Sequence, residues 1–170
     1  AIGTLAVRQY ITEVTILKAW VTEQKERWRT RVIHPTTDSV YGLAAGNLAT
    51  DRRTNHILYG TLKNIQYEER PNIIKGHLYP GVSGKNAFPK EWTARKILKV
   101  ASKIAIDSST IWLPDIPSEK TIDEVQSKGE SLRSRWQTTE TIDGIEVNVI
   151  VEPSGEGIIT SYPTRDYKHK

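Results

Sequence analysis

A helical repeat of apolar residues dominates the N-terminal part of the chain. Between residues 5 and 33, apolar positions recur at spacings of three, four or seven, and charged residues lie between them. This spacing predicts a long amphipathic helix with one apolar stripe, which Pro35 is expected to end. We expect the helix to pack on the rest of the protein; the alternative is an entry or partner-binding element. The predicted stripe consists of Tyr10, Val14, Leu17, Val21 and Trp28.

The middle of the chain alternates helical signals with loops. Capping residues at 36–39 precede a short apolar run, which predicts a helix ending near Gly46 and Asn47, where either residue suits a left-handed conformation. Residues 61–75 are polar and irregular, and the glycine- and proline-rich residues 76–89 are typical of a loop.

A second amphipathic helix is predicted to begin near residues 91–93 and to stop at residues 107–110. A short helical piece is expected later, around Ile122 and Val125, after a segment that contains two prolines. The predicted buried face of the second helix consists of Ile97, Leu98, Val100, Ala101 and Ile104.

The period changes to strict alternation in the C-terminal third. A strand is predicted at 132–141, followed by a hairpin turn at Asp143-Gly144, a half-buried strand at 145–152 and a last strand at 158–162. Three antiparallel strands after an α-rich half indicate the α+β class.

Length and composition narrow the classes of protein. A chain of 170 residues fits one domain, here divided into an N-terminal helical segment at 1–50 and a core at 51–170. The absence of cysteine excludes disulfides and thiolate catalysis. The net charge of +4 favours a polyanionic partner, with a merely basic surface as the alternative, and no apolar run is long enough to span a membrane. Because methionine is absent even at position 1, we expect a fragment of a longer protein.

Three side chains within thirty residues can cleave a phosphodiester. Two imidazoles supply a base and an acid near neutral pH, and an ammonium stabilises a phosphorane, which suggests His56, His77 and Lys85. Solvated loop histidines are the structural alternative. On the last strand, Thr160 and Tyr162 leave the same face, where a hydroxyl and a ring can hold an unpaired nucleotide.

Two arginines and two further histidines also need an interpretation. Arg52 and Arg53 precede His56 and either hold a phosphate or are solvated surface charges. His34 lies at the end of the first predicted helix and His169 in a basic tail, and neither is expected to be catalytic.

Several ordered motifs between residues 52 and 164 resemble the EndoU endoribonucleases, particularly their bacterial toxin branch and more distantly the nidoviral uridylate-specific nuclease. The match rests on the order and spacing of the pieces, since each one alone is unspecific. The pieces are Asn55-His56-Ile57-Leu58-Tyr59-Gly60, Gly76-His77-Leu78, Gly84-Lys85 with Phe88-Pro89 and Trp92, the segment 142–153, and Ile159-Thr160-Ser161-Tyr162-Pro163-Thr164.

The resemblance implies a fold, a reaction and a site. The expected fold is of the barnase/EndoU/colicin/RelE type, with N-terminal helices followed by an antiparallel sheet. His56 takes the place of the general acid, His77 of the general base and Lys85 of the catalytic lysine. Tyr162, with Thr160 two residues earlier, takes the place of the base-contacting tyrosine. The products would be a 2′,3′-cyclic phosphate and a 5′-hydroxyl.

The same resemblance implies a biological setting. The chain is expected to be the C-terminal toxin domain of a contact-dependent growth inhibition or other polymorphic toxin effector. Such an effector is secreted or displayed at the cell surface and delivered into the cytoplasm of a target bacterium. Its expected partners are an RNA substrate, either tRNA or another single-stranded loop cut next to a pyrimidine, and an immunity protein that occludes the active site. We expect a monomer apart from that complex.

Departures from the family and rival interpretations remain. Many bacterial members have Gly-Gly before the second histidine, where this chain has Lys75-Gly76, and the insert at 61–75 is long. These changes affect the expected substrate preference. No metal or other cofactor is expected, although some relatives respond to manganese. The rivals are a non-catalytic RNA-binding module on the same fold, and a scaffold or delivery domain whose long first helix is the working part.

Overall fold

The computed structural model describes residues 2–31, 41–60, 76–81, 84–115, 119–129 and 133–167. The predicted α+β class is confirmed: helices precede a four-stranded antiparallel sheet with the order β1-β2-β3-β4. The helices are α1 (Ile2–Arg29), η1 (Leu43–Ala45, a 3-10 turn), α2 (Asp51–Tyr59), α3 (Ala94–Ile106) and α4 (Glu119–Ser127). The strands are β1 (Leu113–Pro114), β2 (Trp136–Ile142), β3 (Ile145–Glu152) and β4 (Gly157–Pro163).

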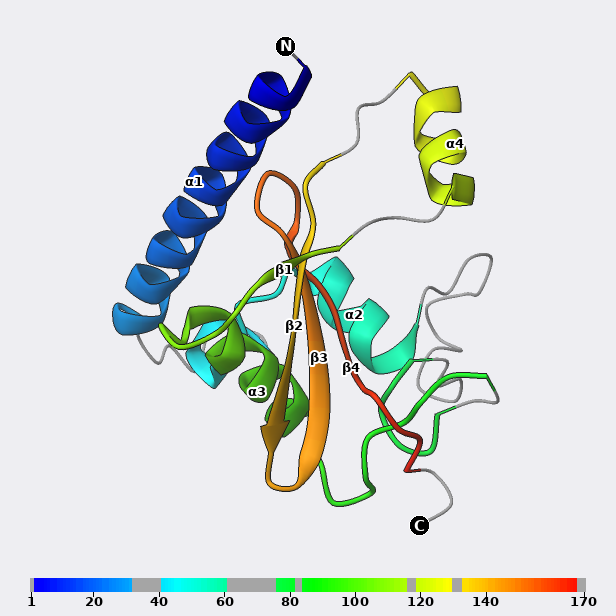
Figure 1. Ribbon diagram of the computed structural model, residues 1–170. Coiled ribbons are helices and arrows are strands. Elements are labelled where there is room, and N and C mark those ends of the chain that lie inside the picture. The colour runs from blue at the N-terminus through cyan, green and yellow to red at the C-terminus, as the bar shows by residue number, and fades with distance from the viewer. Residues whose placement is uncertain are drawn as a thin grey trace.

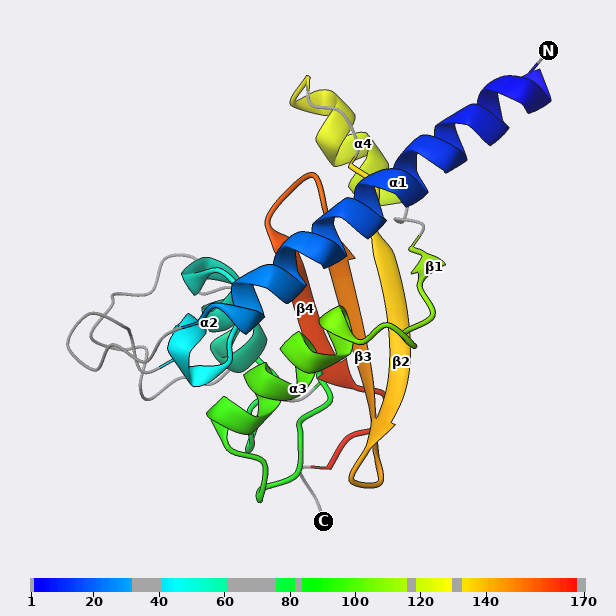
Figure 2. The same cartoon turned by 90° about the vertical axis from the view of Figure 1, so that its left-hand side faces the viewer.

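The helices lie unevenly about the sheet. Helix α3 packs on one face, and α1 crosses outside α3, with its N-terminal half extending past the end of the sheet (Figures 1 and 2). Helix α2 lies at the opposite edge from β1, beside β4 (Figure 2). The second face of the sheet, on which Thr139, Asn148 and Tyr162 lie, is called the open face below.

The core lies between α3 and the sheet face that carries alternate residues of β2, β3 and β4. Phe88 and Trp92, on the segment that leads into α3, stack with ring centroids 5.3 Å apart and close one end of this core. Burial of large side chains of this kind contributes roughly 1.5–3 kcal/mol each. The fully buried apolar residues include Ile57, Leu58, Phe88, Ile97, Leu98, Val147, Val149, Val151 and Ile158.

The first helix is confirmed, and so is most of its predicted stripe: Leu17 is buried, and Val14, Val21 and Trp28 are partly buried and pack against the core. Trp20 and the amide of Gln24 are also buried, and the side chain of Tyr10 lies outside the described ones. The spacing of three and four residues is helical, as expected, but Trp20 was not predicted to be on the stripe. The helix ends at Arg29, before Pro35, which lies outside the described residues.

Three local predictions need correction. The predicted helix before Gly46 is only the 3-10 turn η1, although Gly46 does take the left-handed conformation, with φ +86°. Helix α2 was not predicted at all, and the sheet has a fourth strand, β1, in a proline-containing segment for which no strand was predicted. The hairpin is confirmed, since Asp143 and Gly144 both have positive φ, at 50° and 79°.

Candidate active site

Helix α2 carries His56 in its last turn. The Thr50 side chain caps the helix by accepting a hydrogen bond of 3.2 Å from the Arg53 amide. The buried amide of Asn47 donates to the Thr54 hydroxyl at 2.8 Å and so fixes the helix to the preceding loop. Ile57 and Leu58 enter the core, which leaves the neighbouring His56 half-buried at its edge.

The segment 76–81 docks on the C-terminal end of α2 and brings His77 beside that last turn. The amides of His77 and Leu78 donate to the carbonyls of Ile57 and Leu58, at 2.9 and 3.3 Å. These carbonyls belong to the group that a helix end leaves without an internal partner. A Cβ at Gly76 would lie 2.5 Å from the Leu58 carbonyl carbon and oxygen, so only glycine allows this approach.

The loop that carries Lys85 sets the orientation of the His77 ring. The Nδ1 atom of His77 lies 2.6 Å from the Asn86 carbonyl oxygen, and the Phe88 amide donates to the His77 carbonyl at 2.8 Å. Because a carbonyl can only accept, Nδ1 carries the proton and Nε2 is the basic nitrogen of the neutral ring. The Asn86 side chain also donates to the Pro163 carbonyl at 3.1 Å, which fixes the loop to β4.

Three side chains in a row across the open face, those of Thr139, Asn148 and Tyr162, lead to the His77 ring. The Tyr162 ring lies 5.4 Å from the His77 ring, centroid to centroid. The buried Asn148 amide donates to the Tyr162 hydroxyl at 2.7 Å and accepts from Thr139 at 3.2 Å. Since its hydroxyl accepts from Asn148, Tyr162 still has its own proton to donate.

A β-bulge decides which face of the sheet carries Thr160 and Tyr162. Ile158 pairs with Val151, but Thr160 pairs with Ile150, so Ile159 is an extra residue in β4. Without this extra residue, Tyr162 would pair with Val147 and point toward α3. The prediction that Thr160 and Tyr162 share a face is confirmed, and the face is the one beside His77.

The Lys85 ammonium lies close enough to the two imidazoles to affect their protonation. Burial, followed by the charges of Arg53, Lys85, His77 and Arg52, lowers the pKa of His56 to about 4. Burial also lowers the pKa of His77, opposed by its bond to Asn86 and assisted by the charge of Lys85. Both rings are therefore neutral at pH 7 in the free protein.

The depressed pKa of His56 predicts a pH dependence of stability. In the unfolded chain this ring titrates near 6.5, so between 6.5 and about 4 the unfolded state binds more protons than the folded state. The free energy of unfolding should thus fall as the pH is lowered through this window. Denaturant unfolding at several pH values should show a weaker decline in His56→Gln than in the wild type. Identical declines would contradict the assignment.

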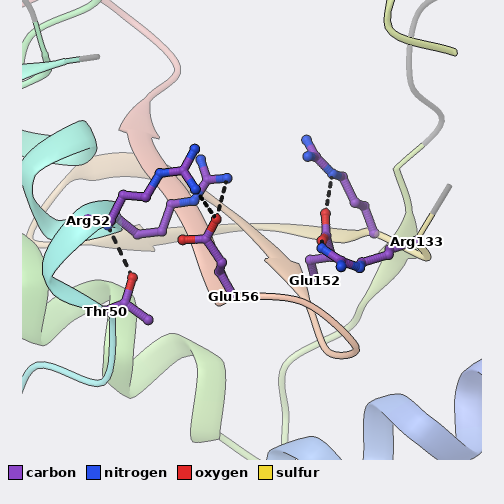
Figure 3. Close-up of polar contacts among 7 residues, drawn as sticks. Thr50, Arg52, Arg133, Glu152 and Glu156 are labelled. Carbon is purple, nitrogen blue, oxygen red and sulfur yellow. Dashed lines mark hydrogen bonds and ion pairs between the residues drawn. The ribbon is translucent and has the colours of Figure 1, made fainter. Parts of the chain in front are cut away.

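The two arginines before His56, for which the sequence offered phosphate binding or solvated surface charge, both form ion pairs. Arg52 and Arg53 bind the same carboxylate oxygen of Glu156, at 3.0 and 3.2 Å (Figure 3). Arg53 is mostly buried, and its Nε atom has no hydrogen-bond partner among the described residues.

All five residues singled out from the sequence thus lie in one region. His56, His77 and Lys85 interact electrostatically, Tyr162 contacts His77, and Thr160 lies two residues before Tyr162 on the same face. The Thr160 hydroxyl has no partner among the described residues. His34 and His169 lie outside the part of the chain that is described. Sequence reasoning missed Asn86 and Asn148, because their roles depend on loop and strand register.

The described residues contain neither a candidate metal site nor a membrane-spanning helix. Among the described residues there is no group of three or more His, Cys, Asp or Glu side chains that could hold a metal ion. No helix in the described ranges has the length and hydropathy to cross a membrane. No protein-family model, curated protein or solved structure matches the chain.

Proposed function

We propose that the protein is an endoribonuclease that cleaves single-stranded RNA by transesterification, without a metal ion. The observation that carries this proposal is the proximity of two imidazoles and an ammonium: His77 binds the end of the helix that carries His56, the Lys85 charge acts on both rings, and the His77 ring is held in a defined tautomer. A non-catalytic RNA-binding surface would have no need for two histidines at one place.

The chemistry assigns one step to each side chain. His77 Nε2 takes the proton of the ribose 2′-hydroxyl, and the 2′-oxygen attacks the phosphorus. The bond from phosphorus to the 5′-oxygen breaks, and that oxygen takes a proton from His56. Lys85 stabilises the negative charge of the phosphorane. The products are a 2′,3′-cyclic phosphate and a 5′-hydroxyl, and the two histidines have exchanged protonation states.

The protonation of His56 depends on the substrate in this mechanism. In the free protein the pKa of His56 is about 4, which leaves little of the acid form at neutral pH. A phosphate bound between Lys85 and the two rings would offset the cations that lower this pKa. RNA binding should therefore be accompanied by proton uptake at His56.

The remaining parts of the proposal follow the resemblance to the EndoU toxins. Tyr162, with Thr160 two residues earlier on the same face, would hold the base next to the cut, and the Tyr162 hydroxyl still has its proton to donate. The biological setting proposed is a toxin effector delivered into the cytoplasm of a target bacterium, with tRNA or a similar loop as its target. A cognate immunity protein would cover this site.

The proposal is tested by RNA cleavage. Purified protein is incubated with total bacterial RNA in the presence of EDTA, alongside the His77→Ala variant. We expect discrete fragments with the wild type and intact RNA with the variant. The same RNA pattern from both proteins would exclude catalysis by this site.

The pKa shifts also predict an acidic optimum for kcat/KM. This parameter reports the ionisations of the free enzyme, which requires one ring protonated and one neutral. Because both pKa values are lowered, the maximum should lie between about 4 and 6.5, whichever ring acts as the acid. The optimum of kcat, measured at saturating RNA, should lie at higher pH. A kcat/KM maximum above pH 7 would contradict this account.

A further inference from the structure

Four arginines surround two glutamates at the turn between β3 and β4. On one side, Glu156 accepts from Arg52 and Arg53, as described above. On the other, Glu152 accepts from Arg135 at 2.8 Å and from Arg133 at 3.5 Å (Figure 3). These six residues are called the arginine cluster. Its members come from α2, from the segment before β2 and from both ends of the turn.

The glutamates fix the arginines without neutralising them. Four guanidinium groups and two carboxylates leave a net charge of +2. Each guanidinium has five N–H donors, and the bonds to the glutamates use only one donor of each arginine. The side chains of Arg52 and Arg133 are 79% and 60% exposed, so their remaining donors are accessible to an anion.

The position of Glu152 depends on the turn itself. The Glu152 carboxylate, which is 8% exposed, lies against Gly155, where a Cβ would collide with it. The Gly155 amide donates to the Glu152 carbonyl at 2.9 Å. This turn, which folds back on a buried carboxylate, therefore carries both glutamates and, through them, the two pairs of arginines (Figure 3).

The arginine cluster is connected to the candidate active site through helix α2 and strand β3. Arg53 precedes His56 by three residues on α2, a rise of about 4.5 Å. On the open face, Glu152 follows Asn148 by four positions of β3, about 13 Å along the strand, and Asn148 binds Tyr162. The arginine cluster is thus separate from His56, His77 and Lys85. Arg53 and Arg52 are nevertheless close enough to His56 to lower its pKa.

We propose that the arginine cluster is a second phosphate-binding site, which holds the RNA backbone beyond the nucleotide being cut. The identity of the ligand rests on the proposed function. Arginine forks bind phosphate oxygens in pairs, and the cluster presents several of them in fixed positions. The substrate is consequently an RNA strand with more than one phosphate, since the phosphate being cut and a second one would be bound at the same time.

The test uses binding of RNA that cannot be cleaved. The probe is a fluorescent 2′-O-methyl RNA octanucleotide, titrated by anisotropy over a range of salt concentrations. Arg52→Gln/Arg133→Gln removes the two exposed arginines, and each glutamate keeps one arginine partner. The control, Arg95→Gln/Lys99→Gln, removes the same charge from exposed positions of α3, across the sheet.

The expected result is a loss of two phosphate contacts in the first variant alone. Its affinity should fall about tenfold at low salt, and the slope of log K against log salt should become shallower by about 1.4, since each single-strand contact contributes roughly 0.7. Equal slopes in wild type and variant, or an equal loss in the control, would overturn the second site. This test measures binding and not cleavage, so a negative result would refute the second phosphate site and leave the proposed function untouched. Conversely, a protein that binds the RNA as expected but never cleaves RNA would refute only the proposed function.

Discussion

Replacing His77 by alanine is expected to lower the single-turnover rate of RNA cleavage by about 10³-fold, because a positioned acid or base contributes roughly 10² to 10⁴. His56→Ala should cost a similar factor. Both rings lie at the edge of the core, so the folded structure should persist, and Asn55→Ala on the exposed side of α2 provides the control. The measurement is quenched-flow cleavage of a labelled RNA by excess enzyme.

A change of leaving group separates the roles of the two histidines. With a nucleoside 3′-(p-nitrophenyl phosphate), the leaving group departs without a proton. If His56 is the acid, the loss in His56→Ala should then largely disappear, while the loss in His77→Ala should persist. The opposite pattern would exchange the two roles, and wild-type rates in both variants with RNA would refute the site.

Gly76→Ala is expected to have the largest effect on stability. The added Cβ would lie 2.5 Å from the Leu58 backbone, so the segment 76–81 must move away from α2. Overpacking of this kind costs about 3 kcal/mol at its upper range, and the amide bonds of His77 and Leu78 to α2 would weaken as well. Because those bonds position His77, catalysis should fall together with the free energy of unfolding.

Gly129→Ala is the matched control for that substitution. Gly129 has φ +70° and nothing within 4 Å of an added Cβ, so its replacement carries only the backbone cost, about 1 kcal/mol. Both free energies come from denaturant titration. If Gly76→Ala lowers the free energy of unfolding no more than Gly129→Ala does, the close approach of segment 76–81 to helix α2 is wrong.

The regular elements could be predicted wherever the hydrophobic period was clear. Helix α3 and the β2–β3 hairpin follow directly from spacing and from the Asp143-Gly144 turn. Helix α2 was missed because only three of its nine residues, Thr54, Ile57 and Leu58, are buried, too few to establish a period. Strand β1 was missed because it has two residues and contains Pro114.

Some residues of the candidate site could also be predicted from the sequence, and others could not. The residue types of His56, His77 and Lys85 suggested chemistry, but only their order and spacing within a family resemblance suggested that they meet. Asn86 and Asn148 carry no sequence signal, since one acts through a loop carbonyl and the other through strand register. That register could not be counted from the sequence, because the extra residue Ile159 shifts every later pair of β4.

One substitution within the substrate tests the central claim most directly. Two RNA oligonucleotides that contain the mapped cleavage site are compared, identical except that one has a single 2′-deoxyribose on the 5′ side of the cut. The account predicts that the ribose substrate yields a 2′,3′-cyclic phosphate and a 5′-hydroxyl, identified by mass spectrometry, and that the deoxyribose substrate stays intact at that position. Cleavage of both substrates, or products with a 3′-hydroxyl and a 5′-phosphate, would contradict it.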